Sequence, residues 1–153
     1  VPESWRIFAT MNSYDKTSLY EMSYAFMRRF AFIRIDAPEN IDSDLVSKYN
    51  DRWEIDAGES DVKAVADIWR KANSNDGRKI GPAIAEDMLG FVAEGESERL
   101  YTDAVVNFVF PQLEGVRNNG DIVRKLMEAE KVEEEHLKTV ARDMLQVKFD
   151  GQE

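Results

Sequence analysis

The sequence contains no cysteine, so disulfide bonds, thiolate metal sites and cysteine nucleophiles are all excluded. No apolar run approaches the ~20 residues that a membrane-spanning helix needs, and residues 1–4 do not resemble a secretory signal peptide. The chain starts at Val1 rather than at a methionine, so we expect a piece of a longer protein or a processed chain. These absences fit a cytoplasmic protein that makes no membrane contact.

Positive charge is also scarce. Lysine and arginine total 20 against 30 aspartate and glutamate residues, which gives a net charge of −10. Such an acidic surface repels phosphate backbones and anionic lipids, so broad nucleic-acid or membrane binding by this chain alone is not expected. The 153 residues are 43% hydrophobic, which is enough for one domain, or two small ones, with a buried core.

Two short apolar segments near the N-terminus predict strands. Residues 5–11 are aromatic and apolar and end at Asn12, whereas residues 30–35 alternate in polarity and are stopped by Pro38. Between them, residues 16–29 carry apolar side chains at three- and four-residue spacings, which predicts a helix. The N-terminal part of the chain is therefore predicted to form a strand, a helix and a second strand.

After residue 40 the strand patterns disappear. Helical patterns cover residues 42–50, 60–72, 81–94, 97–110 and the stretch from 121 to 147. In the second of these, the spacing predicts an apolar face of Val62, Val65, Ile68 and Trp69. Ser60 and Asp121 are expected to cap helices, Pro82 to occupy a first turn and Pro111 to end a helix. We therefore predict an α+β fold that is mostly α, with residues 1–40 forming the end of a mixed core and residues 41–153 a helical bundle.

Four polar residues of the front segment suit nucleotide hydrolysis. The Asn12 amide at the tip of a buried strand can orient a water molecule beside a phosphate, and the Asp15 carboxylate can accept a proton from that water. Arg28 and Arg29 at a helix end could neutralise a phosphate bound by a neighbouring subunit. Taken singly, each is as well explained as a turn residue, a helix cap or a solvated helix end.

Together these residues resemble a known signature. The stretch Ala9-Thr10-Met11-Asn12-Ser13-Tyr14-Asp15-Lys16-Thr17, followed by Tyr24-Ala25-Phe26-Met27-Arg28-Arg29-Phe30-Ala31-Phe32, is similar to that of the McrB-type restriction NTPases of the AAA+ class and of the related MoxR group. The resemblance implies that Asn12 is the sensor-1 residue, that Asp15 helps it to position water, and that Arg28 and Arg29 are arginine-finger candidates. Lys16, Thr17 and Met27 depart from the family pattern, so the resemblance does not decide which arginine is the finger.

The resemblance extends to the helical part. AAA+ proteins carry a small helical lid after the last core strand, and the segment from Phe110 to Gly115 looks like one found in McrB-like lids. It implies that Arg78 is the sensor-2 residue and that Gly81 lies beside the nucleotide at the start of a lid helix. Ala83 stands where MoxR-like proteins place an arginine.

Two motifs of a working NTPase are missing. The sequence has no Gly-x-x-x-x-Gly-Lys-Ser/Thr loop and no strand ending in an acidic pair before Asn12. The resemblance thus implies a C-terminal fragment that is inactive alone, from a homo-oligomeric ring that binds ATP or GTP with Mg²⁺ through its missing part. Contact with DNA or with a nuclease partner subunit would belong to the longer protein. Two alternatives stay open: a MoxR-like chaperone ATPase, and a non-catalytic AAA-like interaction or assembly module.

His136 is the only histidine, and Glu133 lies one helical turn before it. Such a pair could begin a carboxylate–histidine metal site, but the second pair that such sites need is missing. We therefore expect no metal ligands in this chain and interpret the surrounding glutamates as a solvated helix face.

Overall fold

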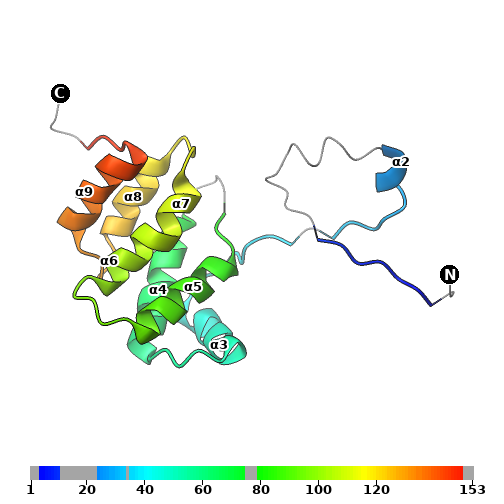
Figure 1. The fold of residues 1–153 in the computed structure, drawn as a ribbon, viewed down its shortest axis with the longest axis horizontal. Helices are drawn as coiled ribbons and strands as arrows, with labels where there is room; N and C mark the ends of the chain where they lie inside the picture. Colours follow the sequence, from blue (N-terminus) through cyan, green and yellow to red (C-terminus); the bar gives the residue numbers. More distant parts are fainter. Residues whose placement is uncertain (1–3, 11–23, 34, 75–78, 150–153) are drawn as a thin grey trace. The chain divides into compact units, whose positions relative to one another are not determined.

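The computed structural model describes residues 4–10, 24–33, 35–74 and 79–149. The chain divides into two compact units, Val1–Ile35 and Asp36–Glu153, which are called here the N-terminal unit and the helical unit (Figure 1). Each is described by itself.

The N-terminal unit contains one short helix, α2 (Tyr24–Met27), and otherwise irregular chain in its described part. No strand occurs among the residues that the structure describes, so the expected strands at 5–11 and 30–35 are not seen. Their apolar side chains are instead exposed, with Phe8 at 92%, Ile33 at 85% and Ile35 at 90%. A strand is stable only when neighbouring strands satisfy its backbone groups, and the described part of this unit offers no such neighbours.

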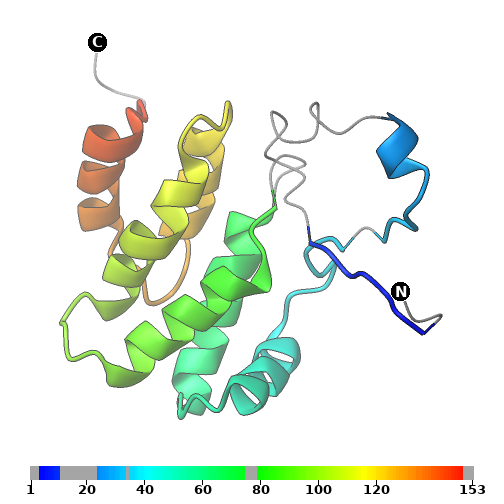
Figure 2. The ribbon, with the colours of Figure 1, turned by 45° about the vertical axis from the view of Figure 1, so that its right-hand side comes forward.

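The described regular structure of the helical unit consists of helices, in agreement with the prediction for this part of the chain. Its elements are α3 (Ser43–Trp53), α4 (Glu59–Ala72), α5 (Pro82–Glu94), α6 (Leu100–Ala104), the π-helical turn η1 (Val105–Val109), α7 (Phe110–Leu113), α8 (Asn119–Met127) and α9 (Glu134–Leu145). Helix α4 packs against α3, α5 and α8, and α9 packs against α7 and α8 (Figure 2).

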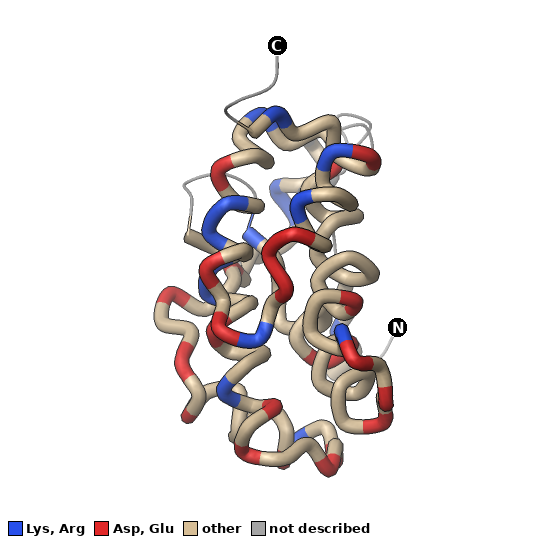
Figure 3. The backbone as a smooth tube through the Cα atoms, turned by 90° about the vertical axis from the view of Figure 1, so that its left-hand side faces the viewer, with Lys and Arg blue, Asp and Glu red and all other residues tan. Residues whose placement is uncertain are grey.

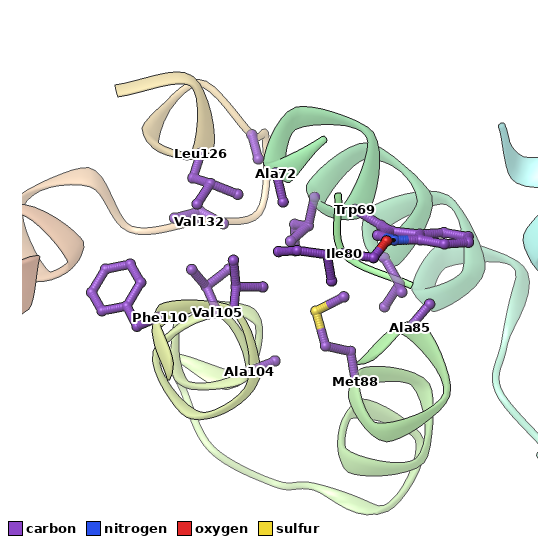
Figure 4. Close-up of a cluster of buried hydrophobic side chains, with 14 of the residues drawn as sticks. Trp69, Ala72, Ile80, Ala85, Met88, Ala104, Val105, Phe110, Leu126 and Val132 are labelled. Atoms are coloured by element: carbon purple, nitrogen blue, oxygen red, sulfur yellow. Dashed lines mark hydrogen bonds between the residues drawn. The ribbon is translucent and has the colours of Figure 1, made fainter. Parts of the chain in front are cut away.

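The core of this unit lies around α4. Val62, Val65, Ile68 and Trp69 were predicted to form the apolar face of this helix, and all four are buried. They belong to one buried cluster with side chains from α5, η1, α7 and α8, several of which are drawn in Figure 4. Burying one such large side chain contributes about 1.5–3 kcal/mol, so this face explains why α4 is helical and central.

Two predicted helix caps, Ser60 and Asp121, are wrong by two and three residues. Helix α4 begins at Glu59 after Gly58, whose N–H donates to the Asp61 carboxylate at 3.2 Å, so Ser60 lies inside the helix. Helix α8 begins at Asn119, which places Asp121 in its first turn. In both cases a carboxylate two residues inside the helix still complements the positive end of the helix dipole.

Pro111 does not end its helix, contrary to the prediction. The helix continues through η1 into α7, where Pro111 is the second residue. A proline inside an α-helix has no N–H to donate, and its ring clashes with the carbonyl four residues earlier, which here belongs to Asn107. We attribute the widened turn just before Pro111 to this conflict, since π turns occur as local bulges within α-helices.

A buried asparagine connects α4 to the segment that leads into α5. The Asn73 amide group donates to the carbonyls of Trp69 at 3.2 Å and Ile80 at 3.0 Å, and its oxygen accepts from the Ile80 N–H at 2.7 Å. The Trp69 indole N–H also donates to the Ile80 carbonyl, at 2.9 Å. These bonds fix the end of α4 and the approach to α5 at one point.

Replacing Asn73 with Ala is expected to destabilise the helical unit by about 1–3 kcal/mol, because the buried Ile80 N–H would lose its acceptor. Urea unfolding followed by helical circular dichroism measures this change. Asn118→Ala is the matched control, because Asn118 is exposed and its side chain makes no capping hydrogen bond. Equal stability of the two variants would contradict the role given to Asn73.

Candidate functional site

Three of the six predicted site residues, Asn12, Asp15 and Arg78, lie outside the described residues. Arg28 and Arg29 are described in the N-terminal unit, and Gly81 in the helical unit. The roles assigned to the first three therefore stay predictions, whereas the local geometry of the others can be stated.

The arginine pair follows directly after α2. The Phe30 N–H donates to the Met27 carbonyl at 3.2 Å, which closes a turn that contains Arg28 and Arg29. Both arginines are exposed. A guanidinium group presents a planar set of N–H donors that matches a phosphate, so two exposed groups in one turn are suited to binding a phosphate from another molecule.

Gly81 precedes the first turn of α5. Its backbone is extended, with φ −76° and ψ 173°, a conformation open to any residue. A Cβ atom added at Gly81 would meet nothing within 4 Å, so neither backbone nor packing requires glycine there. The N-terminus of α5, with Pro82 in its first turn, therefore begins beside open space and without a side-chain cap. This arrangement leaves room for an anion near the first N–H groups but is also that of an ordinary helix start.

A polar cluster that the sequence analysis missed joins three parts of the helical unit. The Tyr101 hydroxyl of α6 donates to Asp61 of α4 at 2.6 Å. The Lys131 ammonium group lies 3.2 Å from the Tyr101 oxygen, 2.5 Å from the Ser60 hydroxyl and 4.8 Å from the centre of the Tyr101 ring. The partners in each of these hydrogen bonds lie 30 to 71 positions apart in the sequence, so no local pattern could have revealed their contact.

The chemistry of this cluster is that of a structural connection. Burial raises the pKa of Tyr101, and the hydrogen bond to Asp61 raises it further. A raised pKa keeps the phenol protonated at neutral pH, so Tyr101 acts as a fixed donor and not as a base or nucleophile. Lys131 and Ser60 are both exposed, and a water-exposed ammonium group does not activate a hydroxyl group.

An open groove of about 310 Å³ lies between α3 and the start of α4. Its polar side chains are those of Ser43, Asp44, Ser47, Asn50, Glu59 and Lys63. The Asn50 side chain exchanges two hydrogen bonds with the Ala57 backbone, and Lys63 is paired with Glu59. The groove therefore offers two serine hydroxyls and the single carboxylate of Asp44, which is too little to define a ligand.

The described residues contain no group of three or more His, Asp or Glu side chains that could hold a metal ion. His136 is half-buried near the start of α9, and the Glu133 carboxylate is paired with Arg99 at 2.7 Å. The Glu133 carboxylate is therefore directed to a guanidinium group in this structure.

Comparison with protein-family models, with curated proteins and with solved structures finds no match to this chain. Among the described helices, none has the length and apolar character needed to cross a membrane. The function of the candidate site is therefore inferred from the residues of this chain alone.

Proposed function

We propose that this chain is the C-terminal part of an AAA+ NTPase similar to the McrB type, in which Arg28 or Arg29 completes the nucleotide site of a neighbouring subunit. One observation carries the proposal. Two exposed arginines share a turn after α2, and this turn lies between two apolar segments that the chain leaves uncovered. Asn12 and Asp15, at the end of the first of these segments, would position the attacking water.

The exposed apolar residues support an incomplete core. Ile7 and Phe8 are both exposed, and so are Phe32 and Ile33. Adjacent residues of a strand point to opposite faces, so each segment would be apolar on both faces of a sheet. Strands of this kind belong inside parallel sheets that are covered on both sides. In this proposal, the remaining strands come from the missing part of the longer protein, and residues 5–11 and 30–35 become strands only in its presence.

The helical unit is assigned as the lid. It follows the N-terminal unit and is built from short helices around α4. A Cβ atom added at Gly81 would meet nothing within 4 Å, which leaves room for a phosphate near the N-terminus of α5. ATP or GTP with Mg²⁺ is the proposed cofactor. The sequence has neither a glycine-rich phosphate loop nor an acidic pair for the metal, so the nucleotide would be held mainly by the missing part. A homo-oligomeric ring, a nuclease partner subunit and movement on DNA are proposed for the longer protein.

The chain alone is expected to show no NTP hydrolysis above a blank, because positioning and charge neutralisation by the phosphate loop and Mg²⁺ supply most of the rate of phosphoryl transfer. Phosphate release by the purified chain measures this. Turnover that survives removal of contaminating NTPases would contradict the proposal.

Two readouts on the longer protein separate the alternatives. Stimulation of hydrolysis by DNA favours the restriction type, whereas stimulation by a protein substrate favours a MoxR-like chaperone. A longer protein without a phosphate loop would leave a non-catalytic assembly module as the function.

A further inference from the structure

The charges of the helical unit are separated between its two ends. The α3–α4 connection lies at one end of the unit and the C-terminal segment after α9 at the other (Figure 1). Acidic residues gather toward the first end and basic residues toward the second (Figure 3). Each end consists of two segments that are distant in the sequence and are connected by hydrogen bonds in or just beyond them.

The acidic end consists of residues 51–59 and 94–98. The first segment has four acidic residues and the second has three, so together they hold seven, against the single base Arg52. All seven are exposed. Asp61 and Tyr101 lie just beyond the two segments. The hydrogen bond of 2.6 Å between their side chains connects the start of α4 to the start of α6.

The basic end consists of residues 117–125 and 138–148. The first segment has three basic residues and the second has three, so together they hold six, against the two acids Asp121 and Asp143. Two bonds connect the segments, from the Asn119 amide to the Leu145 carbonyl at 3.3 Å and from Arg124 to the Lys148 carbonyl at 3.2 Å.

One aromatic ring lies in the middle of this positive charge. Arg124, Lys138 and Arg142 each place their charged group within 6 Å of the centre of the Phe149 ring, at 5.9, 5.8 and 5.6 Å. Met144 lies at the same end and is 53% exposed. No other large apolar side chain of the described helical unit is exposed. An apolar centre with charged residues around it is the usual composition of a protein interface.

We infer that the basic end binds the acidic end of a second copy of this chain, in a head-to-tail contact. The basic end carries an excess of four positive charges, six minus two, and the acidic end an excess of six negative charges, seven minus one. Like charges held together repel, and contact with an oppositely charged surface relieves this repulsion and speeds the encounter. Because the two surfaces differ, each copy can bind one neighbour at each end, which generates a ring or an open chain.

This inference deepens the ring proposed above by naming its surfaces, but its test needs no nucleotide. Sedimentation of the full chain is expected to show association at low ionic strength and dissociation at about 0.5 M salt, where screening acts over a few ångströms. Association through the exposed apolar residues of the N-terminal unit would instead persist or increase in salt.

Two charge-reversal variants make the test specific. The basic-end variant carries Arg142→Glu and Lys148→Glu, and the acidic-end variant carries Asp56→Lys and Glu96→Lys. Each alone is expected to associate at least about tenfold more weakly than the wild type, because the reversals remove the excess positive charge of the basic end or most of the excess negative charge of the acidic end. An equal mixture should form one-to-one dimers and nothing larger, because only one pairing joins an intact basic end to an intact acidic end.

Asp87→Lys is the matched control, since Asp87 is exposed on α5 and belongs to neither end. It should associate as the wild type does, and circular dichroism should show the same helix content in all variants. A wild type that is monomeric at low salt, association that salt does not weaken, or a mixture that stays monomeric would each overturn the head-to-tail contact. None of these results would change the expected hydrolysis by the longer protein.

Discussion

Replacing the arginine that acts as the finger, Arg28 or Arg29, with Ala in the longer protein is expected to slow nucleotide hydrolysis by about 10³–10⁵-fold, while nucleotide binding stays intact. The loss is large because a guanidinium group supplied by a neighbouring subunit neutralises charge that develops only in the transition state. An exposed surface charge has no comparable effect, which makes Arg70→Ala, on the exposed side of α4, a suitable control. Single-turnover hydrolysis together with a nucleotide-binding assay separates the two steps.

A mixing experiment tests whether the arginine acts on a neighbour. The inactive arginine variant is combined with a variant that lacks the lysine of its phosphate loop. Some interfaces of the mixed rings would then join an intact pocket to an intact arginine, so part of the activity should return and should disappear on dilution. If Arg28→Ala and Arg29→Ala are both fully active, the finger assignment is wrong and the pair is an ordinary helix end.

Replacing Asn12 with Ala in the longer protein is expected to slow hydrolysis by about 10²–10³-fold without loss of nucleotide binding. The reason is the proposed position of the Asn12 amide beside the attacking water, with the Asp15 carboxylate three residues later. Asn107→Ala serves as the control, because Asn107 is an exposed asparagine that belongs to neither end of the helical unit. A collapse of binding with normal turnover of the nucleotide that remains bound would show that Asn12 has a structural role.

The helices of the helical unit could be predicted well because helix formation depends mainly on residues that are close in the sequence. The spacing of apolar residues in α4 identified Val65, Ile68 and Trp69 as core residues, and all three are buried. Errors occurred where the choice depends on small local energies. Gly58 and Ser60 both suit a helix start, and the conflict at Pro111 could either end the helix or widen one turn.

The N-terminal unit was less predictable because a strand depends on partners outside its own sequence. Residues 5–10 have the composition of a buried strand, yet in this chain they are irregular and exposed. The polar cluster of Tyr101, Asp61 and Lys131 was missed for a related reason, since its members meet only after the helices have packed. The functional roles of all six proposed site residues, Asn12, Asp15, Arg28, Arg29, Arg78 and Gly81, are still predictions, because they rest on a sequence signature.

The bonds at Asn73 also bear on how this protein can change in evolution. Asn73 and Ile80 are joined by two hydrogen bonds, so the two ends of the connection between α4 and α5 are held together. Extra residues inserted between them would alter mainly the entropy of loop closure, which costs only about 0.6 kcal/mol for each doubling of length. The α4–α5 connection is therefore a position where relatives can acquire new recognition segments, and where a tag or label can be inserted while the helices keep their packing.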